Sequence, residues 1–461
     1  MEIEFAGADR EVTGSCHIVR VNDKTVLLDC GLFQGHRSDA DVKNRTVPCP
    51  IAEIDAVVLS HAHLDHSGRL PFLVKAGYSG PIHATKATAD LCEIMLADSA
   101  HIQESDYEFL TRHGREVSEP LYGLRDAARV EELMECRSYD AWFDVCTGVR
   151  ARFVEAGHIL GSASVVLEAT SGSAVSRLIF SGDIGRAGLA IIRDPAPPED
   201  AADAVIMEST YGNRDHESVA LSREHLGRVV RETAARGGRV LIPAFAVGRT
   251  QELVYDLQVL WRDKAIPPIP IIIDSPLATA ATGVFERNTD LFDRTEGPIR
   301  QIDKPFRFEG LTYTSSTEES KALNRRVGAM ILIAGSGMVE GGRILHHLVN
   351  GASDSRNTIL IVGFQAEHTL GRRIVERRPV IRVLGNDVEL RAKVEIINGY
   401  SAHADRTELA SWLAAVRRNS PQLRHVYLVH GEEAAQAALS ESLTRQGYRV
   451  SCPERRDRVV V

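Results

Sequence analysis

Residues 59–68 read LSHAHLDHSG and place four side chains that commonly bind metals, His61, His63, Asp65 and His66, within six positions. The apolar run IDAVV at 54–58 precedes them and predicts a buried strand, so the four side chains stand on the loop that follows it. Imidazole and carboxylate are the ligands of catalytic zinc, which keeps one position open for water. Because alternate residues of a loop can point to one side, His61 and His63 can serve one ion while Asp65 and His66 serve a second.

The alternative interpretation is a set of surface histidines that hold no metal. A single histidine would favour this alternative without a metal, because histidine often serves as an ordinary polar residue in cores and on surfaces. Four ligand-type residues in so short a window favour the metal site instead. Their spacing also differs from the H-E-x-x-H pattern, in which both histidines stand on one face of a helix.

Three further ligand-type residues follow other apolar runs: His158 in FVEAGHILGSAS, Asp183 in LIFSGDIG and His430 in YLVHGEE. Ligands of open α/β sheets bind beyond the carboxyl ends of the strands, so these side chains can reach one place. Two ions that share Asp183 would account for all seven residues, at the separation of roughly 3.5 to 4 Å that two-metal hydrolytic sites use.

Most of the chain repeats one unit, in which an apolar run is followed by a polar loop and a helical stretch, and this predicts α/β layers. Two segments differ: 96–139 is charged and helical in period, and RDPAPPEDAAD at 193–203 is typical of a connector. In VEIINGYSAHAD and YLVHGEE, histidine and acidic residues again follow apolar runs, as they do in the first part of the chain. We therefore predict one metal-binding domain, formed by 1–204 and 377–461, that is interrupted by an inserted α/β domain at 205–376.

Length and charge limit the remaining classes of protein. At 461 residues the chain exceeds what one hydrophobic core usually serves. Its formal charge of −9 argues mildly against indiscriminate nucleic-acid binding but allows a cleft with local positive charge. The amino terminus lacks the basic and apolar regions typical of a signal peptide, and no stretch approaches the length of an apolar membrane span, so we expect a cytoplasmic protein without a membrane partner. The seven cysteines form no C-x-x-C pair and are not expected to bind metal.

These motifs resemble a known family. HAHLDH, the Gly-His pair at 157–158 and SGD at 181–183 resemble the metallo-β-lactamase superfamily, and ESTYG, SAHAD and VHGE resemble its β-CASP nuclease branch. The chain is most similar to the compact bacterial ribonucleases of that branch and to the endonuclease of pre-mRNA 3′-end processing. The likeness runs nearly end to end and includes REVTGSCH, LLDCGLFQG, PAFAVGRTQE, DSPLA, EESKALN and GSGM. It implies an αββα sandwich interrupted by a β-CASP α/β domain with a largely parallel sheet.

The resemblance also implies roles for single residues. His61, His63 and His158 would hold one zinc ion, Asp65, His66 and His430 the other, and Asp183 would bridge them. Asp29 would orient a ligand of the first loop, and Glu208 would hydrogen-bond His403. His430 stands at the third β-CASP motif, where members that act on RNA carry His and those that act on DNA typically carry Val. The catalytic candidates are thus Asp65, His403, Glu208 and Asp29.

The resemblance implies a zinc-dependent ribonuclease that hydrolyses single-stranded RNA, mainly as an endonuclease and with 5′-exonuclease action as a second activity, in RNA processing or decay. Two Zn²⁺ ions per chain, for which Mn²⁺ is an alternative, would activate a hydroxide that attacks phosphorus. His403, held by Glu208, would protonate the departing ribose oxygen and leave 5′-phosphate and 3′-hydroxyl products. The alternative for this pair is an ordinary hydrogen bond or a helix cap. A homodimer is a further expectation.

The inserted domain contributes candidates for RNA binding. Ser336, Gly337 and Met338 lie in a Gly-rich turn that can offer backbone N–H groups to a phosphate, although such glycines often serve only to allow a positive φ. Arg249 is a candidate phosphate contact, with a solvated surface arginine as the alternative. In relatives the active site lies between the two domains, which would favour single strands. His368 replaces a glycine of many relatives, and we do not assign it as a ligand.

Two other functions compete with the nuclease. The first is a small-molecule metallo-hydrolase of thioesterase or lactonase type, because the same scaffold serves many substrates. The second is a catalytically silent RNA-binding subunit, which would be expected to lack metal ligands. All seven ligand-type residues are present in this chain. RNA cleavage that depends on metal would separate the nuclease from both.

Overall fold

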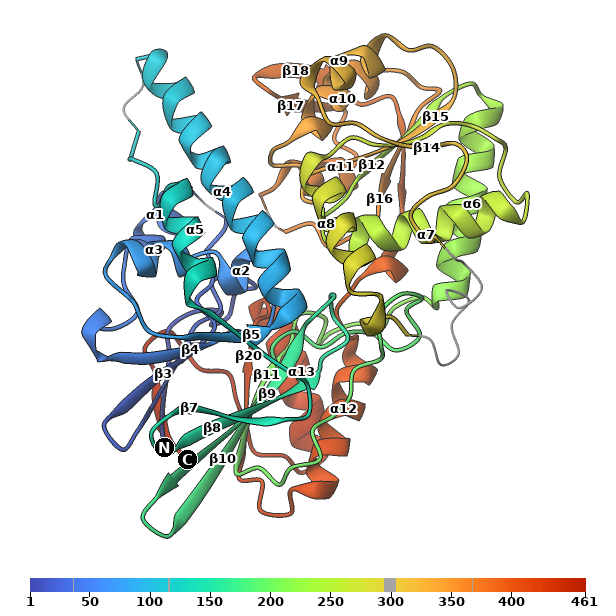
Figure 1. The fold of residues 1–461 in the computed structure, drawn as a ribbon. Coiled ribbons are helices and arrows are strands. Elements are labelled where there is room, and N and C mark those ends of the chain that lie inside the picture. Colours follow the sequence, from blue (N-terminus) through green and yellow to red (C-terminus); the bar gives the residue numbers. More distant parts are fainter. Residues whose placement is uncertain (36, 115–116, 294–303, 367) are drawn as a thin grey trace. The chain divides into compact units, whose positions relative to one another are not determined.

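The computed structural model describes residues 1–35, 37–114, 117–293, 304–366 and 368–461 (Figure 1). They form two compact units. Unit 1 consists of Met1–Ala187, Arg193–Asp215 and His403–Val461, and unit 2 consists of Gly188–Ile192 and His216–Ala402. The chain therefore leaves unit 1 and later returns to it.

Unit 1 contains, among its described residues, two seven-stranded sheets. The first has the order β22-β1-β2-β3-β4-β5-β6, and its strands in chain order are β1 (Glu2–Phe5), β2 (His17–Val21), β3 (Lys24–Leu28), β4 (Ile54–Val58), β5 (Ile82–Thr85), β6 (Met134–Arg137) and β22 (Arg458–Val460). The second has the order β21-β20-β11-β10-β9-β8-β7, and its strands are β7 (Trp142–Cys146), β8 (Val149–Glu155), β9 (Ala163–Ser171), β10 (Ala174–Phe180), β11 (Ala204–Glu208), β20 (His425–Val429) and β21 (Val450–Ser451).

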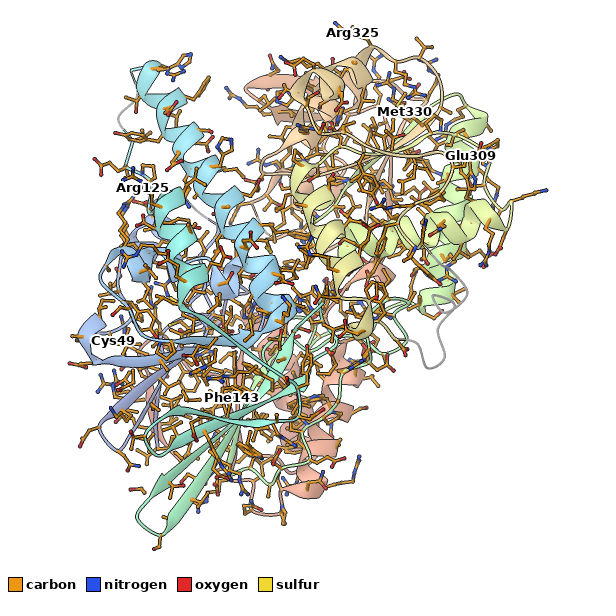
Figure 2. All side chains as sticks on the ribbon, viewed as in Figure 1. Cys49, Arg125, Phe143, Glu309, Arg325 and Met330 are labelled. Atoms are coloured by element: carbon orange, nitrogen blue, oxygen red, sulfur yellow. The ribbon has the colours of Figure 1, made fainter. Side chains whose placement is uncertain are left out.

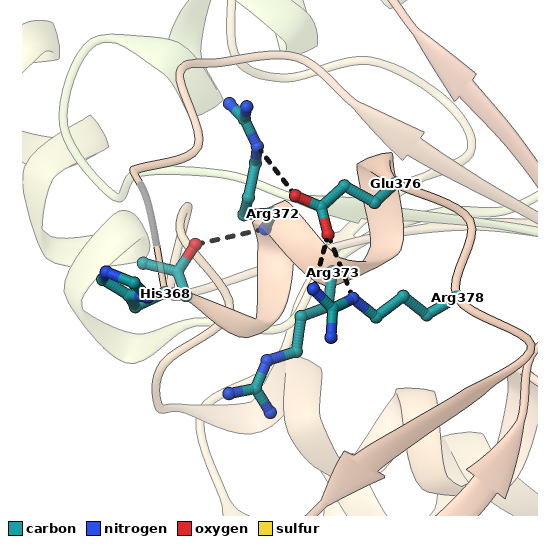
Figure 3. A pocket seen from close by; sticks show the side chains of 6 residues that line it. His368, Arg372, Arg373, Glu376 and Arg378 are labelled. Carbon is teal, nitrogen blue, oxygen red and sulfur yellow. Dashed lines mark hydrogen bonds and ion pairs between the residues drawn. The ribbon is translucent and has the colours of Figure 1, made fainter.

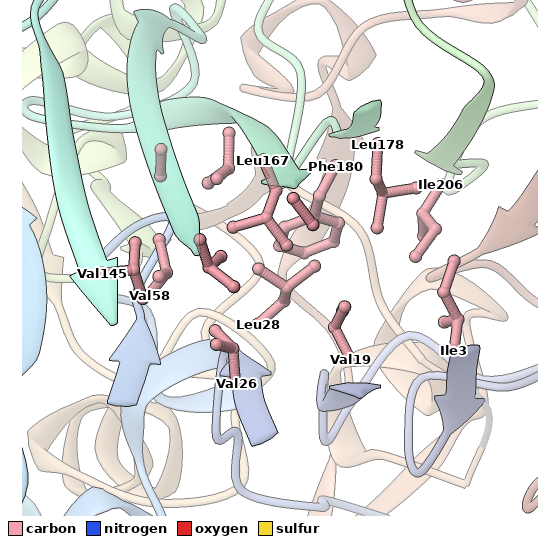
Figure 4. Packing of buried hydrophobic residues seen from close by; sticks show 14 of the residues in the cluster. Ile3, Val19, Val26, Leu28, Val58, Val145, Leu167, Leu178, Phe180 and Ile206 are labelled. Atoms are coloured by element: carbon pink, nitrogen blue, oxygen red, sulfur yellow. The ribbon is translucent and has the colours of Figure 1, made fainter. Parts of the chain in front are cut away.

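The two sheets share one apolar core (Figure 4). Leu28 and Val58 enter it from the first sheet, and Leu167 and Phe180 enter it from the second. Each of these side chains is at most 2% exposed. Because successive side chains of a strand point to opposite faces, alternate residues reach this core and the others face the helices outside. Figure 2 shows Phe143 at the margin of the core, whereas Arg125 lies on an outer helix.

Helices cover the outer faces of this sandwich. On the second sheet, α12 (Arg406–Asn419) and α13 (Glu433–Arg445) pack Leu409, Trp412 and Leu439 against the strands. The other helices of unit 1 are α1 (Arg37–Asn44), η1 (Ile51–Glu53), α2 (Leu64–Ser67), α3 (Leu70–Lys75), α4 (Lys86–Arg112) and α5 (Leu124–Leu133). Of these, α4 contacts β5 and β6 of the first sheet. The predicted αββα sandwich is confirmed.

Unit 2 is built on a parallel sheet with the order β14-β13-β15-β12-β16-β19. Its strands are β12 (Arg239–Pro243), β13 (Ile271–Ile273), β14 (Leu311–Tyr313), β15 (Met330–Ala334), β16 (Thr358–Ile361) and β19 (Lys393–Ile396), and a hairpin of β17 (Val380–Val383) and β18 (Asn386–Glu389) is separate. Its helices are α6 (Val219–Ala235), α7 (Arg249–Arg262), α8 (Pro276–Arg287), η2 (Thr289–Leu291), α9 (Thr317–Arg325), α10 (Arg343–Gly351), α11 (Leu370–Val375) and η4 (Asn398–Tyr400). The inserted α/β domain with a largely parallel sheet is thus confirmed.

The borders of the units differ from the predicted domain borders at 205 and 377. Strand β11 at 204–208 pairs with β10 and β20, so the chain stays in unit 1 as far as Asp215. At the other end, β19 pairs with β16 in the sheet of unit 2, so residues 377–402 belong to unit 2. The motif SAHAD therefore spans the border, and its His403 opens the returning segment of unit 1.

Two sequence expectations concern helices. In the stretch 96–139, α4 and α5 are helices as predicted, but β6 adds an edge strand to the first sheet. Within the described ranges, every helix is either too short or too polar to cross a bilayer.

His17 of β2 is a buried imidazole whose ring packs against Phe5 and Phe180, with ring centroids 5.5 and 5.4 Å away. The side chain is 0% exposed, and neither ring nitrogen has a hydrogen-bond partner among the described residues. Burial, with smaller contributions from His66 and His430, lowers the pKa of His17 to about 3. The folded chain therefore carries a neutral imidazole at neutral pH, and the unpaired polar atoms cost stability.

We expect His17→Leu to raise the free energy of unfolding at pH 7 by about 1 kcal/mol, because an apolar side chain removes the unpaired nitrogens. The folded pKa of His17 lies below its unfolded value of about 6.5, so its contribution to stability is complete above pH 6.5 and is lost as the pH falls toward 3. Between pH 7 and pH 5 the free energy of unfolding of the wild type should fall by about 2 kcal/mol more than that of the variant.

Urea unfolding at both pH values measures this difference, and the exposed His113→Leu is the control. An equal pH dependence in wild type and His17→Leu would contradict the prediction.

Candidate metal centre

The seven predicted metal ligands lie together in unit 1, each beyond the end of a strand. His61, His63, Asp65 and His66 follow β4, with the last two in the short helix α2. His158 follows β8, Asp183 follows β10 and His430 follows β20. Since β4 belongs to the first sheet and the other three strands to the second, both sheets contribute residues to the site.

Four of these residues form a first donor group: His61, His63, His158 and Asp183. The Nδ1 atom of His63 lies 3.2 Å from Nε2 of His61 and 3.2 Å from Nε2 of His158. Oδ2 of Asp183 lies 3.4 Å from Nε2 of His61 and 3.6 Å from Nε2 of His158. The donor atoms of all four side chains therefore face one point.

Asp65, His66 and His430 form a second donor group. Nε2 of His430 lies 3.3 Å from Nε2 of His66 and 3.3 Å from Oδ2 of Asp65. Oδ2 of Asp183 lies 3.3 Å from Nε2 of His66, and Oδ1 of Asp183 lies 3.4 Å from Nδ1 of His430. The Asp183 carboxylate thus faces both groups.

The donor sets fit divalent cations. In a tetrahedral zinc site with Zn–N distances of 2.0 to 2.1 Å, neighbouring donor atoms stand about 3.3 Å apart, which matches the spacing in both groups. Asp183 is 1% exposed, and neither of its carboxylate oxygens accepts a well-directed hydrogen bond from a described residue. A buried carboxylate without such partners is costly unless a cation compensates it. Imidazole nitrogens and carboxylate oxygens suit zinc and, as an alternative, manganese.

Asp29 holds His66 from behind. Its Oδ2 lies 2.6 Å from Nδ1 of His66 and accepts a hydrogen bond of 2.9 Å from the Ser60 hydroxyl. Its Oδ1 accepts a hydrogen bond of 2.8 Å from the Ser60 backbone N–H. These contacts turn Nε2 of His66 toward the other donor atoms, and the orienting role of Asp29 stays a prediction. A carboxylate behind a ligating imidazole fixes the ring and raises its basicity.

The backbone has unusual conformations at the ends of β3 and β20, and two loops lie in close contact there. Asp29 and His430 follow β3 and β20 directly with φ angles of 62° and 48°, which are uncommon for residues other than glycine. Such conformations cost free energy and concentrate at functional sites. Gly31 is needed for contact between two loops, because a Cβ atom there would lie 1.6 Å from the Asp65 carbonyl oxygen. Backbone hydrogen bonds of 2.8 Å from Cys30 N–H to His66 O and from Ser15 N–H to Asp65 O hold the ligand loop against this segment.

His403 and Glu208 form a pair next to these two donor groups, and together with Asp183 and His430 they make a third cluster of potential ligands. Nδ1 of His403 lies 3.2 Å from Oε2 of Glu208 and 3.9 Å from Oδ2 of Asp183. Glu208 is fully buried at the end of β11, and its Oε1 accepts a hydrogen bond of 2.6 Å from the Ile184 N–H. The contact predicted between Glu208 and His403 is therefore present, and it fixes one side of the imidazole.

Protonation in the site follows burial and charge. Burial, together with the neighbouring imidazoles, lowers the pKa of His61 well below its ordinary value, and burial lowers the pKa of His63 to about 4. Both rings are therefore neutral at neutral pH, the state that binds metals. Burial opposes a charged His403, but the Glu208 and Asp183 carboxylates outweigh it and raise the pKa of His403 to about 9. His403 can therefore carry a proton at neutral pH.

The predicted RNA-binding residues lie in unit 2, where the structure gives several of them internal partners. The Ser336 hydroxyl accepts hydrogen bonds from the backbone N–H groups of Glu340 and Gly341, and the Gly337 carbonyl accepts one from Gln365. The carbonyl of Met338 accepts a hydrogen bond from the Gly371 N–H. RNA binding by this turn stays a prediction.

Arg249 does not lie on the surface, which was the alternative to a phosphate contact. It is 6% exposed at the start of α7, and its Nη1 lies 2.5 Å from Oε2 of Glu252. A phosphate contact would have to replace or share this ion pair. Phosphate binding by Arg249 stays a prediction. His368 belongs to none of the donor groups of the described residues and lies exposed in unit 2.

Two residues that contact candidate ligands were not predicted from the sequence. The Ser60 hydroxyl lies 3.0 Å from Nδ1 of His61, and the Thr210 hydroxyl lies 3.1 Å from Nδ1 of His430. Each hydroxyl therefore stands behind the ring of a ligand. Ser60 directly precedes the HAHLDH run and Thr210 lies two residues after Glu208, so their positions were the available signal.

The motifs DSPLA and EESKALN have a structural role that the sequence did not reveal. The fully buried Asp274 of DSPLA accepts a hydrogen bond of 2.6 Å from Ser320 of EESKALN and lies 2.6 Å from Nε2 of His347. Arg343 donates to the other carboxylate oxygen at 2.7 Å. Burial alone would raise the pKa of Asp274, but these partners hold it far below its ordinary value. The network joins β13, α9 and α10 inside unit 2.

Three family models match the chain: the metallo-beta-lactamase superfamily over residues 9–211, the Beta-Casp domain over 250–374, and the Zn-dependent metallo-hydrolase RNA specificity domain over 387–453. The protein named ribonuclease TTHA0252, from Thermus thermophilus, is 39% identical over 456 residues, which cover 98% of each chain. The protein named transcription termination factor FttA, from Methanosarcina mazei, is 32% identical over 97% of this chain and 69% of its own length. A crystal structure of a protein of unknown function from Enterococcus faecalis covers 100% of this chain and 99% of its own, with a TM-score of 0.57 at 13% identity, and supports the fold alone.

Proposed function

Because this chain belongs to the β-CASP ribonuclease branch of the metallo-β-lactamase superfamily, we propose that it hydrolyses phosphodiester bonds of single-stranded RNA. We infer that it acts mainly as an endonuclease in RNA processing or decay, and that 5′-exonuclease action is a second activity open to the same site. The observation that carries this proposal is the position of His403 and Glu208 beside two donor groups that both lie close to the Asp183 carboxylate. A proton donor next to paired cation sites suits the cleavage of a phosphodiester.

In this proposal each chain holds two zinc ions, with manganese as the alternative. His61, His63 and His158 would hold one ion, Asp65, His66 and His430 would hold the other, and Asp183 would contact both. The chemistry that such a pair supplies when bound is a water nucleophile that is active at neutral pH and the neutralisation of phosphate charge. The spacing of the donor atoms and the buried Asp183 carboxylate support this assignment.

The side chains of the site have separate tasks in this scheme. Asp29 holds the His66 ring through its contact of 2.6 Å with Nδ1. Glu208 orients His403 through Nδ1, so Nε2 of His403 is the atom that would give a proton to the departing ribose 3′-oxygen. General acid catalysis of this kind is typically worth 10²- to 10⁴-fold in rate. The products would carry a 5′-phosphate and a 3′-hydroxyl.

We expect the purified protein to cut an unstructured single-stranded RNA into fragments with 5′-phosphates, because the site combines cation ligands with a proton donor. A chelator should abolish cleavage, and zinc or manganese should restore it. Gel analysis of end-labelled RNA measures this, and a thioester and a lactone offered in parallel test the small-molecule alternative. Hydrolysis of either small substrate with the RNA left intact would show that the proposal is wrong. Zinc content near zero in active preparations would exclude zinc as the metal used.

A further inference from the structure

A hollow of about 370 Å³ lies beside α11 in unit 2 (Figure 3). The residues that line it are His368, Thr369, Arg372, Arg373, Glu376 and Arg378. Three guanidinium groups and one carboxylate thus face the same space, together with an imidazole. With a neutral imidazole, the side chains of the hollow carry a net positive charge.

Glu376 orders two of these arginines and does not cancel the charge of the third. Its Oε1 accepts a hydrogen bond of 3.3 Å from Nε of Arg372, and its Oε2 accepts one of 3.0 Å from Nε of Arg378. Arg378, followed by Arg372, lowers the pKa of Glu376, so this carboxylate stays ionised and keeps both guanidinium groups in place. No interaction joins Arg373 to the other residues drawn in Figure 3, and its side chain has no ion pair with any described residue. Its guanidinium donors are therefore available to a ligand.

The charge of this segment contrasts with that of the whole chain. Residues 371–382 contain five arginines and one acidic residue, in a protein with a formal charge of −9. An ordinary solvated surface usually mixes both signs, and arginines crowded on a short stretch repel one another. Such clusters are the usual electrostatic footprint of a polyanion site.

The shape of the groups indicates the chemical class of the ligand. Guanidinium is planar and can give two parallel hydrogen bonds to a phosphate, whereas Thr369 is occupied as the cap of α11, where its hydroxyl accepts from the Arg372 N–H at 3.1 Å. His368 is exposed and holds a φ of 68°, a conformation that favours glycine. An exposed imidazole beside arginines can also stack on a base of a single strand.

We propose that this hollow binds phosphodiester groups of the RNA backbone through Arg373 and Arg372, with His368 as a stacking surface. The proposal rests on the proposed function, because it adds a binding site to the same substrate. The hollow lies within unit 2 and is lined by residues of that unit alone. It accounts for the exposed arginines of this segment as part of substrate binding.

Fluorescence anisotropy with a labelled single-stranded RNA tests this proposal on the full chain, with a chelator present so that the RNA stays intact. Arg373→Glu should raise Kd by about tenfold. It should also make the fall of log Kobs with log salt less steep by about 0.7, the value for one phosphate contact with a single strand. Arg325→Glu is the matched control, because Arg325 of α9 is also an exposed arginine of unit 2 without an ion pair among the described residues. Its Kd should stay within about twofold of the wild type. His368→Gly, which suits the backbone conformation, should weaken binding by about twofold to threefold without reducing the salt slope.

The outcomes separate this inference from the proposed function. If the wild type binds RNA and cleaves it when zinc is supplied, but Arg373→Glu and Arg325→Glu bind RNA alike, the hollow is not a backbone site and only this inference is overturned. If the wild type neither binds nor cleaves RNA, the proposed function fails and this inference fails with it. Titration calorimetry with inorganic phosphate adds a third arm: if Arg373→Glu changes phosphate binding but not RNA binding, the ligand is a free anion and the assignment to RNA is wrong.

Discussion

Asp183→Asn should lose most of the bound metal and slow RNA cleavage by at least about 10³-fold, which is equivalent to about 4 kcal/mol of transition-state stabilisation. The carboxylate of Asp183 faces both donor groups, with Oδ2 at 3.3 Å from Nε2 of His66 and at 3.4 Å from Nε2 of His61. Asparagine keeps the size of the side chain but removes the charge and turns N–H donors toward the imidazoles. This one substitution should therefore weaken cation binding at both donor groups.

Elemental analysis after gel filtration measures the metal content, and circular dichroism checks that the variant is folded. Asp55→Asn is a matched control in unit 1, because Asp55 accepts hydrogen bonds from Lys24 and the Thr25 N–H and belongs to none of the donor groups among the described residues. The control should keep its metal and its activity. Full metal content in folded Asp183→Asn would show that the shared role assigned to Asp183 is wrong.

His403→Ala should keep its metal but cleave RNA about 10²- to 10⁴-fold more slowly, the range for loss of a general acid. His403 is not one of the seven proposed ligands, and its Nδ1 is held by Glu208, with 3.2 Å to Oε2. The substitution should therefore remove the proton donor and leave both donor groups intact. Single-turnover cleavage of labelled RNA gives the rate of the chemical step.

A second substrate distinguishes proton donation from a structural role. A phosphodiester with a 4-nitrophenolate leaving group needs no proton on departure, so His403→Ala should slow its hydrolysis by less than about tenfold. His425→Ala is the control, because His425 of β20 is hydrogen-bonded to Ser451 outside the donor groups. It should behave as the wild type with both substrates. Equal rate losses of His403→Ala with RNA and with the nitrophenyl ester would contradict a role in acid catalysis.

The local part of the metal centre could be predicted because its ligands are close in sequence. His61, His63, Asp65 and His66 stand on one loop after β4, so no distant contact is needed to bring them together. The roles of the distant residues were implied by the family resemblance. Ser60 and Thr210 were not identified, because a hydroxyl behind a ligand has no sequence pattern of its own.

Residues of unit 2 show where a local pattern is insufficient. Arg249 was a candidate phosphate contact with a solvated surface arginine as the alternative, yet its guanidinium is buried against Glu252 in the first turn of α7. The predicted border at 377 differs from the border of the compact units, because the apolar run of β19 has the same appearance in either domain. Its pairing with β16 assigns it to unit 2. Which neighbour a strand pairs with depends on long-range contacts that the strand's own residues do not specify.

By itself, the sequence determined the alternation of strands and helices, the existence of an inserted α/β unit and the ligand types of the candidate metal centre. Hydrophobic periodicity and the chemistry of imidazole and carboxylate are properties of short segments, so they can be recognised before folding. Only the tertiary structure decided the borders of the units, the burial of Arg249 and the distance of 3.3 Å between His66 and His430, which are 364 positions apart. The borders and the burial of Arg249 depend on strand pairing and packing within each unit. The short distance between His66 and His430 arises from the packing of the two sheets of unit 1, because only the folded chain brings the ends of their strands to one place.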